Sequence, residues 1–154
     1  MDFHPIGVVR TAHTELAATP IQSSLNRAEH ARIVLDERYA DGLSASLKAG
    51  VAAVPAEATA AMVFLGDMPV IPAAVLPLLA EAIEHGATAA ATIHRSQRGH
   101  PVVLSRALFP AIQTLTGDQG AGPLLKGLGE GLALIPTDDP GVLLDVDRPG
   151  DAPP

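Results

Sequence analysis

The stretch that decides the fold is Ala61-Met-Val-Phe-Leu65, five apolar residues in succession, which Gly66-Asp67-Met68-Pro69 follows directly. A short apolar run that ends at a glycine predicts a strand whose two faces are both buried, as in a parallel sheet covered by helices. Glycine then lets the chain turn, and the aspartate projects from the end of the strand. This stretch therefore predicts one buried strand with a polar group at its carboxyl end.

The chain on either side alternates between helix and strand patterns. Helices are predicted over residues 44–54, which Pro55 ends, and over residues 71–85, with Gly86 at the C-cap. Further strands are predicted over residues 88–93, 101–104 and 142–147. This alternation predicts an α/β sandwich with a largely parallel sheet, in which ligands bind at the carboxyl ends of the strands.

The composition narrows the classes of function. The chain has 154 residues, of which 47% are hydrophobic and only 3% aromatic, so we expect a core of Ala, Val, Leu and Ile. A net charge of -7 gives no source of attraction for nucleic-acid phosphates, and we expect no general nucleic-acid binding. The sequence has no cysteine, which fits a reducing cytoplasm and excludes thiolate chemistry. No apolar run reaches the length of a membrane span, so we expect no membrane attachment.

Asp67 is the first candidate for chemistry, because it follows the buried strand. A carboxylate there is suited to hold Mg²⁺, which usually takes one or two carboxylates and completes its coordination with water and phosphate oxygens. The alternative is that Asp67 caps the helix predicted to begin near residue 71.

The segment Leu144-Asp145-Val146-Asp147 is the second candidate. If it is a strand, alternation places both carboxylates on one face, where they repel each other unless a cation or water lies between them. This pattern predicts a second contribution to a metal site. The alternative is a solvated edge strand near the end of the chain.

Two further segments carry polar groups beside glycines. In Arg98-Gly99-His100-Pro101, the glycine permits the backbone to approach a ligand closely, although a lone histidine is often structural. In Thr116-Gly-Asp-Gln-Gly120, Asp118 is a candidate for substrate binding, and the alternative is a simple turn.

The order of these motifs resembles the MobA/MocA-like molybdopterin nucleotidyltransferases over residues 39–151, including Tyr39-Ala-Asp-Gly-Leu43. The resemblance implies a Rossmann-like nucleotidyltransferase fold that transfers CMP or GMP from CTP or GTP to a molybdopterin-like acceptor, with Mg²⁺ as cofactor. It implies that Asp67 and Asp147 are catalytic and that Asp145 joins them as a metal ligand. The residues that it assigns to substrate binding are Gly66, Met68, Pro69, Arg98, Gly99, His100 and Asp118.

The first forty residues depart from that family. Its members begin with a Gly-rich, basic loop that cradles phosphates through backbone N–H groups, whereas Gly7 is the one glycine in residues 1–38. Instead, Ile6-Gly-Val-Val-Arg-Thr11 and Ala18-Thr-Pro-Ile-Gln22 resemble the opening of the TsaA/TrmO family of S-adenosylmethionine-dependent tRNA methyltransferases. We therefore expect a segment 1–40 of that kind, which replaces the N-terminal βαβ unit, joined to a nucleotidyltransferase segment 41–154.

Three hypotheses follow for function. The first is a nucleotidyltransferase of molybdenum cofactor biosynthesis, whose activity depends on how the chain holds a nucleotide without the Gly-rich loop. The second is a noncatalytic Rossmann-like binding module. The third is a fragment related to the tRNA methyltransferases, which rests on one short motif against four ordered ones.

Overall fold

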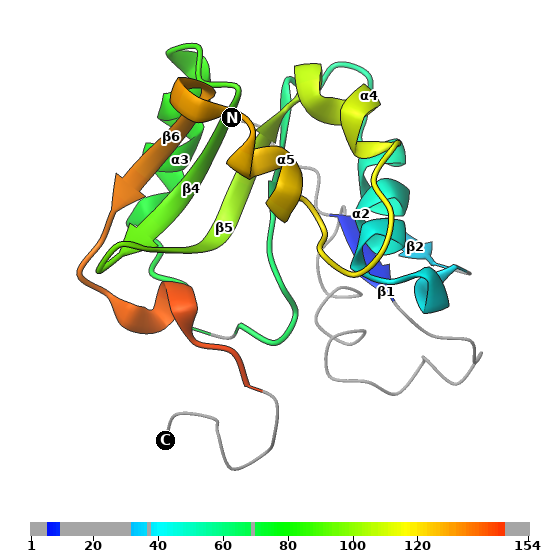
Figure 1. The fold of residues 1–154 in the computed structure, drawn as a ribbon, viewed down its shortest axis with the longest axis horizontal. Coiled ribbons are helices and arrows are strands. Elements are labelled where there is room, and N and C mark those ends of the chain that lie inside the picture. Colours follow the sequence, from blue (N-terminus) through cyan, green and yellow to red (C-terminus); the bar gives the residue numbers. More distant parts are fainter. Residues whose placement is uncertain (1–5, 10–31, 37, 69, 147–154) are drawn as a thin grey trace. The chain divides into compact units, whose positions relative to one another are not determined.

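The computed structural model describes residues 6–9, 32–36, 38–68 and 70–146 (Figure 1). The chain divides into two compact units. Unit 1 comprises Met1–Ala58 and Phe109–Gly127, and unit 2 comprises Thr59–Leu108 and Leu128–Pro154.

Unit 2 is built on a four-stranded sheet with the order β3-β5-β4-β6. Its strands are β3 (Ala60–Val63), β4 (Ala89–His94), β5 (Gln97–Ser105) and β6 (Leu132–Pro136). β5 runs antiparallel to both β3 and β4, whereas β6 runs parallel to β4. Arg95 and Ser96 join β4 to β5 in a two-residue turn, and their positive φ angles of 46° and 69° suit the twist of a hairpin.

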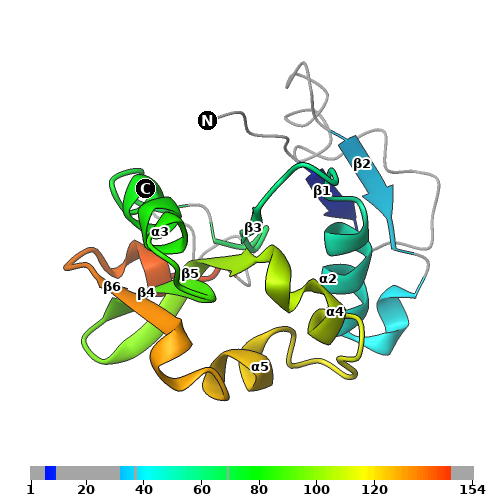
Figure 2. The same ribbon diagram turned by 90° about the horizontal axis from the view of Figure 1, so that it is seen from above.

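Helix α3 (Val75–Glu84) packs against one face of this sheet, as Figure 2 shows. Val75 and Leu79 lie four residues apart, so they share one side of the helix. Both are buried in a cluster with Ala90 of β4 and Val103 of β5. These contacts form the apolar core on that face of unit 2.

Short 3₁₀ turns complete unit 2: η3 (Arg106–Leu108), η4 (Gly129–Gly131) and η5 (Pro140–Leu143). η5 begins after Asp139, whose carboxylate accepts a 2.8 Å hydrogen bond from the Gly141 N–H. Val142 is fully buried, and η5 contacts β5. A Cβ at Gly99 would collide with the carbonyl oxygen of Val142, so the glycine is what permits this close approach.

Unit 1 contains the parallel pair β1 (Ile6–Val9) and β2 (Arg32–Leu35). Helix α2 (Leu43–Ala52) contacts both strands and also α4 (Phe109–Ile112). The remaining elements are η2 (Tyr39–Asp41) and α5 (Gly122–Lys126). The N–H groups of Leu43 and Ser44, at the start of α2, donate to the 116–120 turn, which ties two distant parts of the sequence together.

The predicted α/β class is confirmed, and β3 and α2 form where the sequence patterns place them, whereas α3 begins at Val75 and not at residue 71. Parallel pairing is found in β1–β2 and β4–β6, while the β4–β5 hairpin makes the four-stranded sheet mixed. Residues 142–146, the described part of the strand predicted over residues 142–147, form no strand, because Pro140 and the Asp139 cap begin a 3₁₀ turn there. β6, over which no strand is predicted from the sequence, is the last strand of the described residues. No described helix is long and apolar enough to cross a membrane.

Gly42 and Gly86 distinguish the effect of backbone strain from the effect of a steric clash. Gly42 and Gly86 have φ angles of 99° and 97°, but a Cβ at Gly42 would lie 2.6 Å from the Gly117 oxygen, whereas one at Gly86 would meet nothing within 4 Å. We expect Gly86→Ala to lower the free energy of unfolding by about 1 kcal/mol through backbone strain, and Gly42→Ala to lower it by about 3 kcal/mol. Urea denaturation of both variants measures this, and equal losses would contradict the packing described at Gly42.

Candidate active site

Asp67 lies in a tight turn directly after β3. The turn is closed by the Met68 N–H, which donates to the Leu65 oxygen at 3.3 Å, and the Asp67 side chain is exposed. The Asp67 carbonyl oxygen accepts a 2.8 Å hydrogen bond from the Val146 N–H. The structure therefore joins the two acidic segments that the sequence singles out, and places exposed Asp145 next to the residue that makes this bond.

Asp67 does not cap the following helix. α3 begins at Val75, after Ala74, and no side chain caps its first turn. The capping alternative for Asp67 is therefore wrong. Pro69 and Asp147, two other predicted site residues, lie outside the described residues.

His100 lies on β5, two residues after Arg98, where the pairing of β5 with β4 is irregular. Burial lowers the pKa of His100 and the Arg98 guanidinium lowers it further, while the Asp67 carboxylate and a backbone hydrogen bond with Val63 act in the opposite direction. Both charged groups are thus near enough to act on the imidazole. We call Asp67, Arg98 and His100 the Asp67 cluster.

The backbone of β5 is held firmly at this cluster. The hydroxyl of fully buried Thr92 donates to the His100 carbonyl oxygen at 3.0 Å. The Nδ1 atom of His100 is itself buried and has no hydrogen-bond partner among the described residues. The imidazole is therefore positioned by its backbone, with one ring nitrogen unused. The sequence does not indicate that Thr92 and Val63 contact His100, because both residues lie within apolar segments.

The Asp67 cluster contains one group that suits a bound cation and another that suits a bound anion. Carboxylate oxygens suit Mg²⁺, and a guanidinium suits phosphate or carboxylate groups. Within the described ranges, no three His, Asp or Glu side chains are grouped to hold a metal ion. The predicted ligand set relied on Asp147 as its third carboxylate, so this set stays a prediction.

Asp118 belongs to unit 1, where its carboxylate accepts a 2.9 Å hydrogen bond from the Leu43 N–H. Leu43 is the first residue of α2, so Asp118 satisfies one of the free N–H groups at the start of that helix. The Gly117 carbonyl accepts the Ser44 N–H at 3.1 Å. This turn thus has a structural role, and substrate binding by Asp118 stays a prediction.

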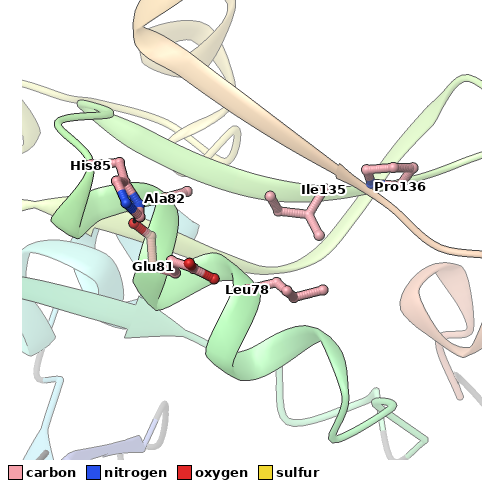
Figure 3. Close-up of a pocket in the computed structure, with 6 residues that line it drawn as sticks. All are labelled: Leu78, Glu81, Ala82, His85, Ile135 and Pro136. Atoms are coloured by element: carbon pink, nitrogen blue, oxygen red, sulfur yellow. Dashed lines mark hydrogen bonds between the residues drawn. The ribbon is translucent and has the colours of Figure 1, made fainter.

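Each unit also has a cavity that the sequence motifs do not indicate. In unit 1, a cavity of ≈ 660 Å³ lies beside α2; we call it the α2 cavity. In unit 2, a groove of ≈ 390 Å³ runs between α3 and the end of β6, with Leu78 on one wall and Ile135 on the other (Figure 3). None of the predicted site residues lines either of these two hollows.

A family model described as the MobA-like NTP transferase domain matches residues 3–134. This match includes residues 3–38, and none of the comparisons supports the likeness of residues 1–43 to the TsaA/TrmO family. No curated protein matches the chain.

Several solved structures are similar. An Rv0371c homolog from Mycobacterium sp. strain JC1 is 30% identical with a TM-score of 0.73, covering 95% of this chain and 70% of its own. A nucleotidyl transferase from Methanothermobacter is 25% identical with a TM-score of 0.67, covering 94% of this chain and 68% of its own. Rv0371c from Mycobacterium tuberculosis, in complex with manganese, is 24% identical with a TM-score of 0.72, covering 95% and 73%.

The role of Asp118 as a helix cap gives a stability prediction. Replacing it with Ala leaves the Leu43 N–H without its acceptor, so we expect Asp118→Ala to lower the free energy of unfolding by about 1 kcal/mol. Asp118→Asn keeps an acceptor oxygen and should lose less. Urea denaturation compares them with Asp138→Ala, which removes an exposed carboxylate of unit 2. An Asp118→Ala protein as stable as wild type would refute the cap.

The lowered pKa of His100 gives a pH prediction. As the pH falls below the ordinary histidine value of 6.5, the unfolded chain takes up a proton that the folded chain resists. Stability is therefore complete above pH 6.5 and decreases as the pH falls from there toward the lower folded-state pKa. We expect His100→Gln to reduce this decrease and the control His85→Gln, at an exposed position, to leave it unchanged. Denaturation midpoints at several pH values test this; identical slopes in both variants would contradict it.

Proposed function

The chain belongs to the family of MobA-like NTP transferase domains, and we propose that it transfers CMP or GMP from CTP or GTP to a molybdopterin-like acceptor, with release of pyrophosphate. The family match covers most of the sequence, and a nucleotidyl transferase of the same fold aligns with nearly all of it. The identity of the nucleotide, the identity of the acceptor and the choice of Mg²⁺ as the cation are the parts that we propose.

The observation that carries the proposal is the hydrogen bond between the Val146 N–H and the Asp67 oxygen. It holds the loop after β3 next to the segment that contains Asp145, so that two distant parts of the sequence, each with an exposed carboxylate, lie side by side. Such a pair fits Mg²⁺, which needs few protein ligands when phosphates and water supply the rest. Asp67 and Asp145, with Asp147 after them, would hold the ion. Rv0371c, which has this fold, was solved with manganese.

Nucleotidyl transfer depends on positioning and on neutralising charge more than on a protein acid or base. The cation, when bound, neutralises charge on the phosphates. Arg98 presents a guanidinium that suits an anionic group of a substrate. His100, whose lowered pKa favours the neutral imidazole, adds no positive charge between Asp67 and Arg98, and its Nδ1 atom is buried. Gly66, which is exposed, permits close approach of a substrate to the backbone, whereas the space beside Gly99 is taken by the Val142 carbonyl oxygen.

Calorimetry tests the cation site. We expect wild type to bind Mg²⁺ in the presence of CTP or GTP, and Asp67→Ala to weaken that binding by at least about tenfold, because it removes a direct ligand. Asp138→Ala, an equally exposed carboxylate in the same unit, is the matched control and should bind as wild type does.

Release of pyrophosphate, measured with a molybdopterin acceptor, tests the reaction itself. Nucleotide binding without any release would favour the noncatalytic binding module. Calorimetric traces that show no binding by wild type or by Asp67→Ala would contradict the catalytic proposal.

A further inference from the structure

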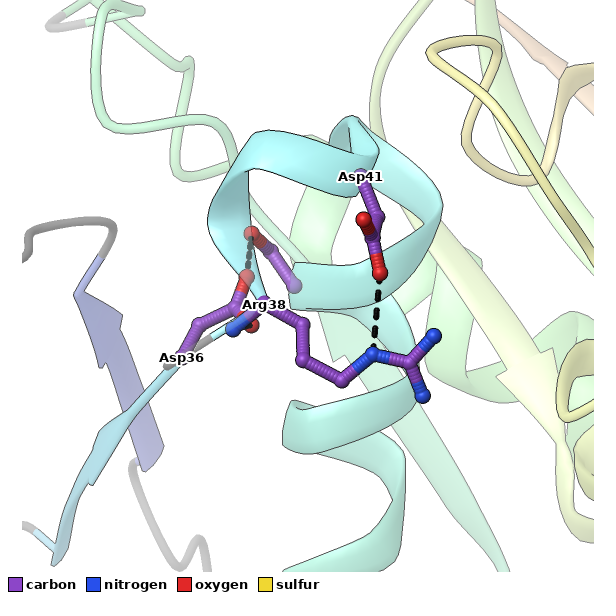
Figure 4. Close-up of polar contacts among 4 residues, drawn as sticks. Asp36, Arg38 and Asp41 are labelled. Carbon is purple, nitrogen blue, oxygen red and sulfur yellow. Dashed lines mark hydrogen bonds and ion pairs between the residues drawn. The ribbon is translucent and has the colours of Figure 1, made fainter.

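The buried polar side chains of the described residues belong to Asp36, Ser44, Ser46, Thr92 and His94. In unit 1 they serve the packing of that unit: the Asp36 carboxylate accepts hydrogen bonds from the Ser46 hydroxyl and from the Arg38 N–H (Figure 4). Thr92 is different, because the hydroxyl of this fully buried residue donates to the candidate active site. A hydroxyl costs free energy in the core unless it is hydrogen-bonded, so this contact accounts for a threonine at this position.

Thr92 lies where the pairing of β4 with β5 is irregular. The register of the two strands shifts between Ala91 and Ile93, so that Thr92 alone lies opposite residues 99–101 of β5. Extra residues of this kind form a bulge, in which the regular ladder of backbone hydrogen bonds is interrupted. The 3.0 Å hydrogen bond from the Thr92 hydroxyl to the His100 carbonyl oxygen lies at this interruption. A side chain of β4 therefore holds the bulge of β5.

The same bulge is linked to β3. The imidazole of His100 is hydrogen-bonded to the backbone of Val63, the last residue of β3. Because β5 lies between β4 and β3, the contacts of Thr92, His100 and Val63 run in one line across three strands. Val63 precedes the loop that carries Asp67, so this line ends at the start of that loop.

The bulge also supports η5. A Cβ at Gly99 would collide with the Val142 carbonyl oxygen, so the backbone of the bulge is in direct contact with η5. η5 contacts β4 as well as β5. After η5, the Val146 N–H donates to the Asp67 oxygen at 2.8 Å. A displacement of the bulge would therefore move η5, and with it the segment that contains Asp145.

We propose that Thr92 is a positioning residue of the candidate active site: its hydroxyl fixes the bulge of β5, and through the bulge both the Asp67 loop and the segment that contains Asp145. This inference rests on the proposed function, in which these two segments hold the cation. Thr92 is fully buried and touches no substrate. It acts through His100 and Gly99.

Hydrogen exchange of the full chain, followed by NMR at single backbone amides, tests this inference. Thr92→Val keeps the shape of the side chain but removes the donor to the His100 carbonyl. We expect exchange at the Val146 N–H to become about tenfold faster, because the loss of a buried hydrogen bond changes a local equilibrium by about that factor. The Thr88 N–H, which donates to the Gly131 oxygen at the other end of β4, should keep its wild-type rate. Equal acceleration at both amides would indicate a general loss of stability and would contradict the inference.

Two further variants isolate the hydroxyl. Thr92→Ser keeps the hydroxyl and loses only a methyl group, so it should restore slow exchange at Val146. Ser105→Ala is the matched control, because the buried Ser105 hydroxyl has no hydrogen-bond partner in the described part of the chain. Should Thr92→Val fail to fold, Thr92→Cys, whose thiol is a weak donor, takes its place. Wild-type exchange at Val146 without the hydroxyl, or exchange in Thr92→Ser as fast as in Thr92→Val, would overturn the inference.

Calorimetry with Mg²⁺ and CTP or GTP connects Thr92 to the cation. We expect Thr92→Val to weaken Mg²⁺ binding by roughly tenfold, as the loss of a supporting group does at metal sites, and Thr92→Ser and Ser105→Ala to bind as wild type does. Wild-type affinity for Mg²⁺ in folded Thr92→Val would overturn the inference and leave the proposed function standing. Should wild type bind no Mg²⁺, the proposed function would fall, while exchange at Val146 would still decide whether the hydroxyl fixes the two segments.

Discussion

The contact between the Val146 N–H and the Asp67 oxygen is the constraint on which the candidate active site depends. It fixes where the chain goes after β3, and at the same time where it goes after η5. η5 is in turn seated on β5, because Gly99 leaves room for the Val142 carbonyl and Val142 is fully buried. One backbone hydrogen bond and one buried valine thus bring together three segments that lie far apart in the sequence. The positions of Asp67, Arg98 and Asp145 depend on these contacts.

The sequence predicts well those elements whose signal is local. The run before Gly66 is apolar at every position, so β3 and the exposed Asp67 after it could be predicted, and α3 has a clear apolar side. The β4–β5 hairpin could not, since its turn is Arg95-Ser96 in place of the usual Asn-Gly, and the strand predicted over residues 101–104 therefore covers only part of β5. No strand is predicted over residues 132–136, where the structure has β6.

The features that the sequence does not predict depend on contacts between residues that are distant in the sequence. Asp118 caps a helix that begins 75 residues earlier in the sequence, and no local pattern distinguishes such a cap from a turn. Asp36 likewise gains its partners from the following helix and turn. The α2 cavity is formed by side chains from residues 36–52 and 113–117, so neither segment alone indicates it. Cavities are properties of packing, which periodicity does not encode.

The position of β6 has a consequence for the behaviour of the protein in a crowded solution. β6 is an edge strand of the described sheet, and one row of its peptide groups is left unpaired by the other strands. Such a row is a template on which a strand from another molecule can add. Pro136, at its end, has no N–H to offer, and it shortens the edge that can be extended. Of the two edges of the described sheet, β6 is thus the one that ends in a proline.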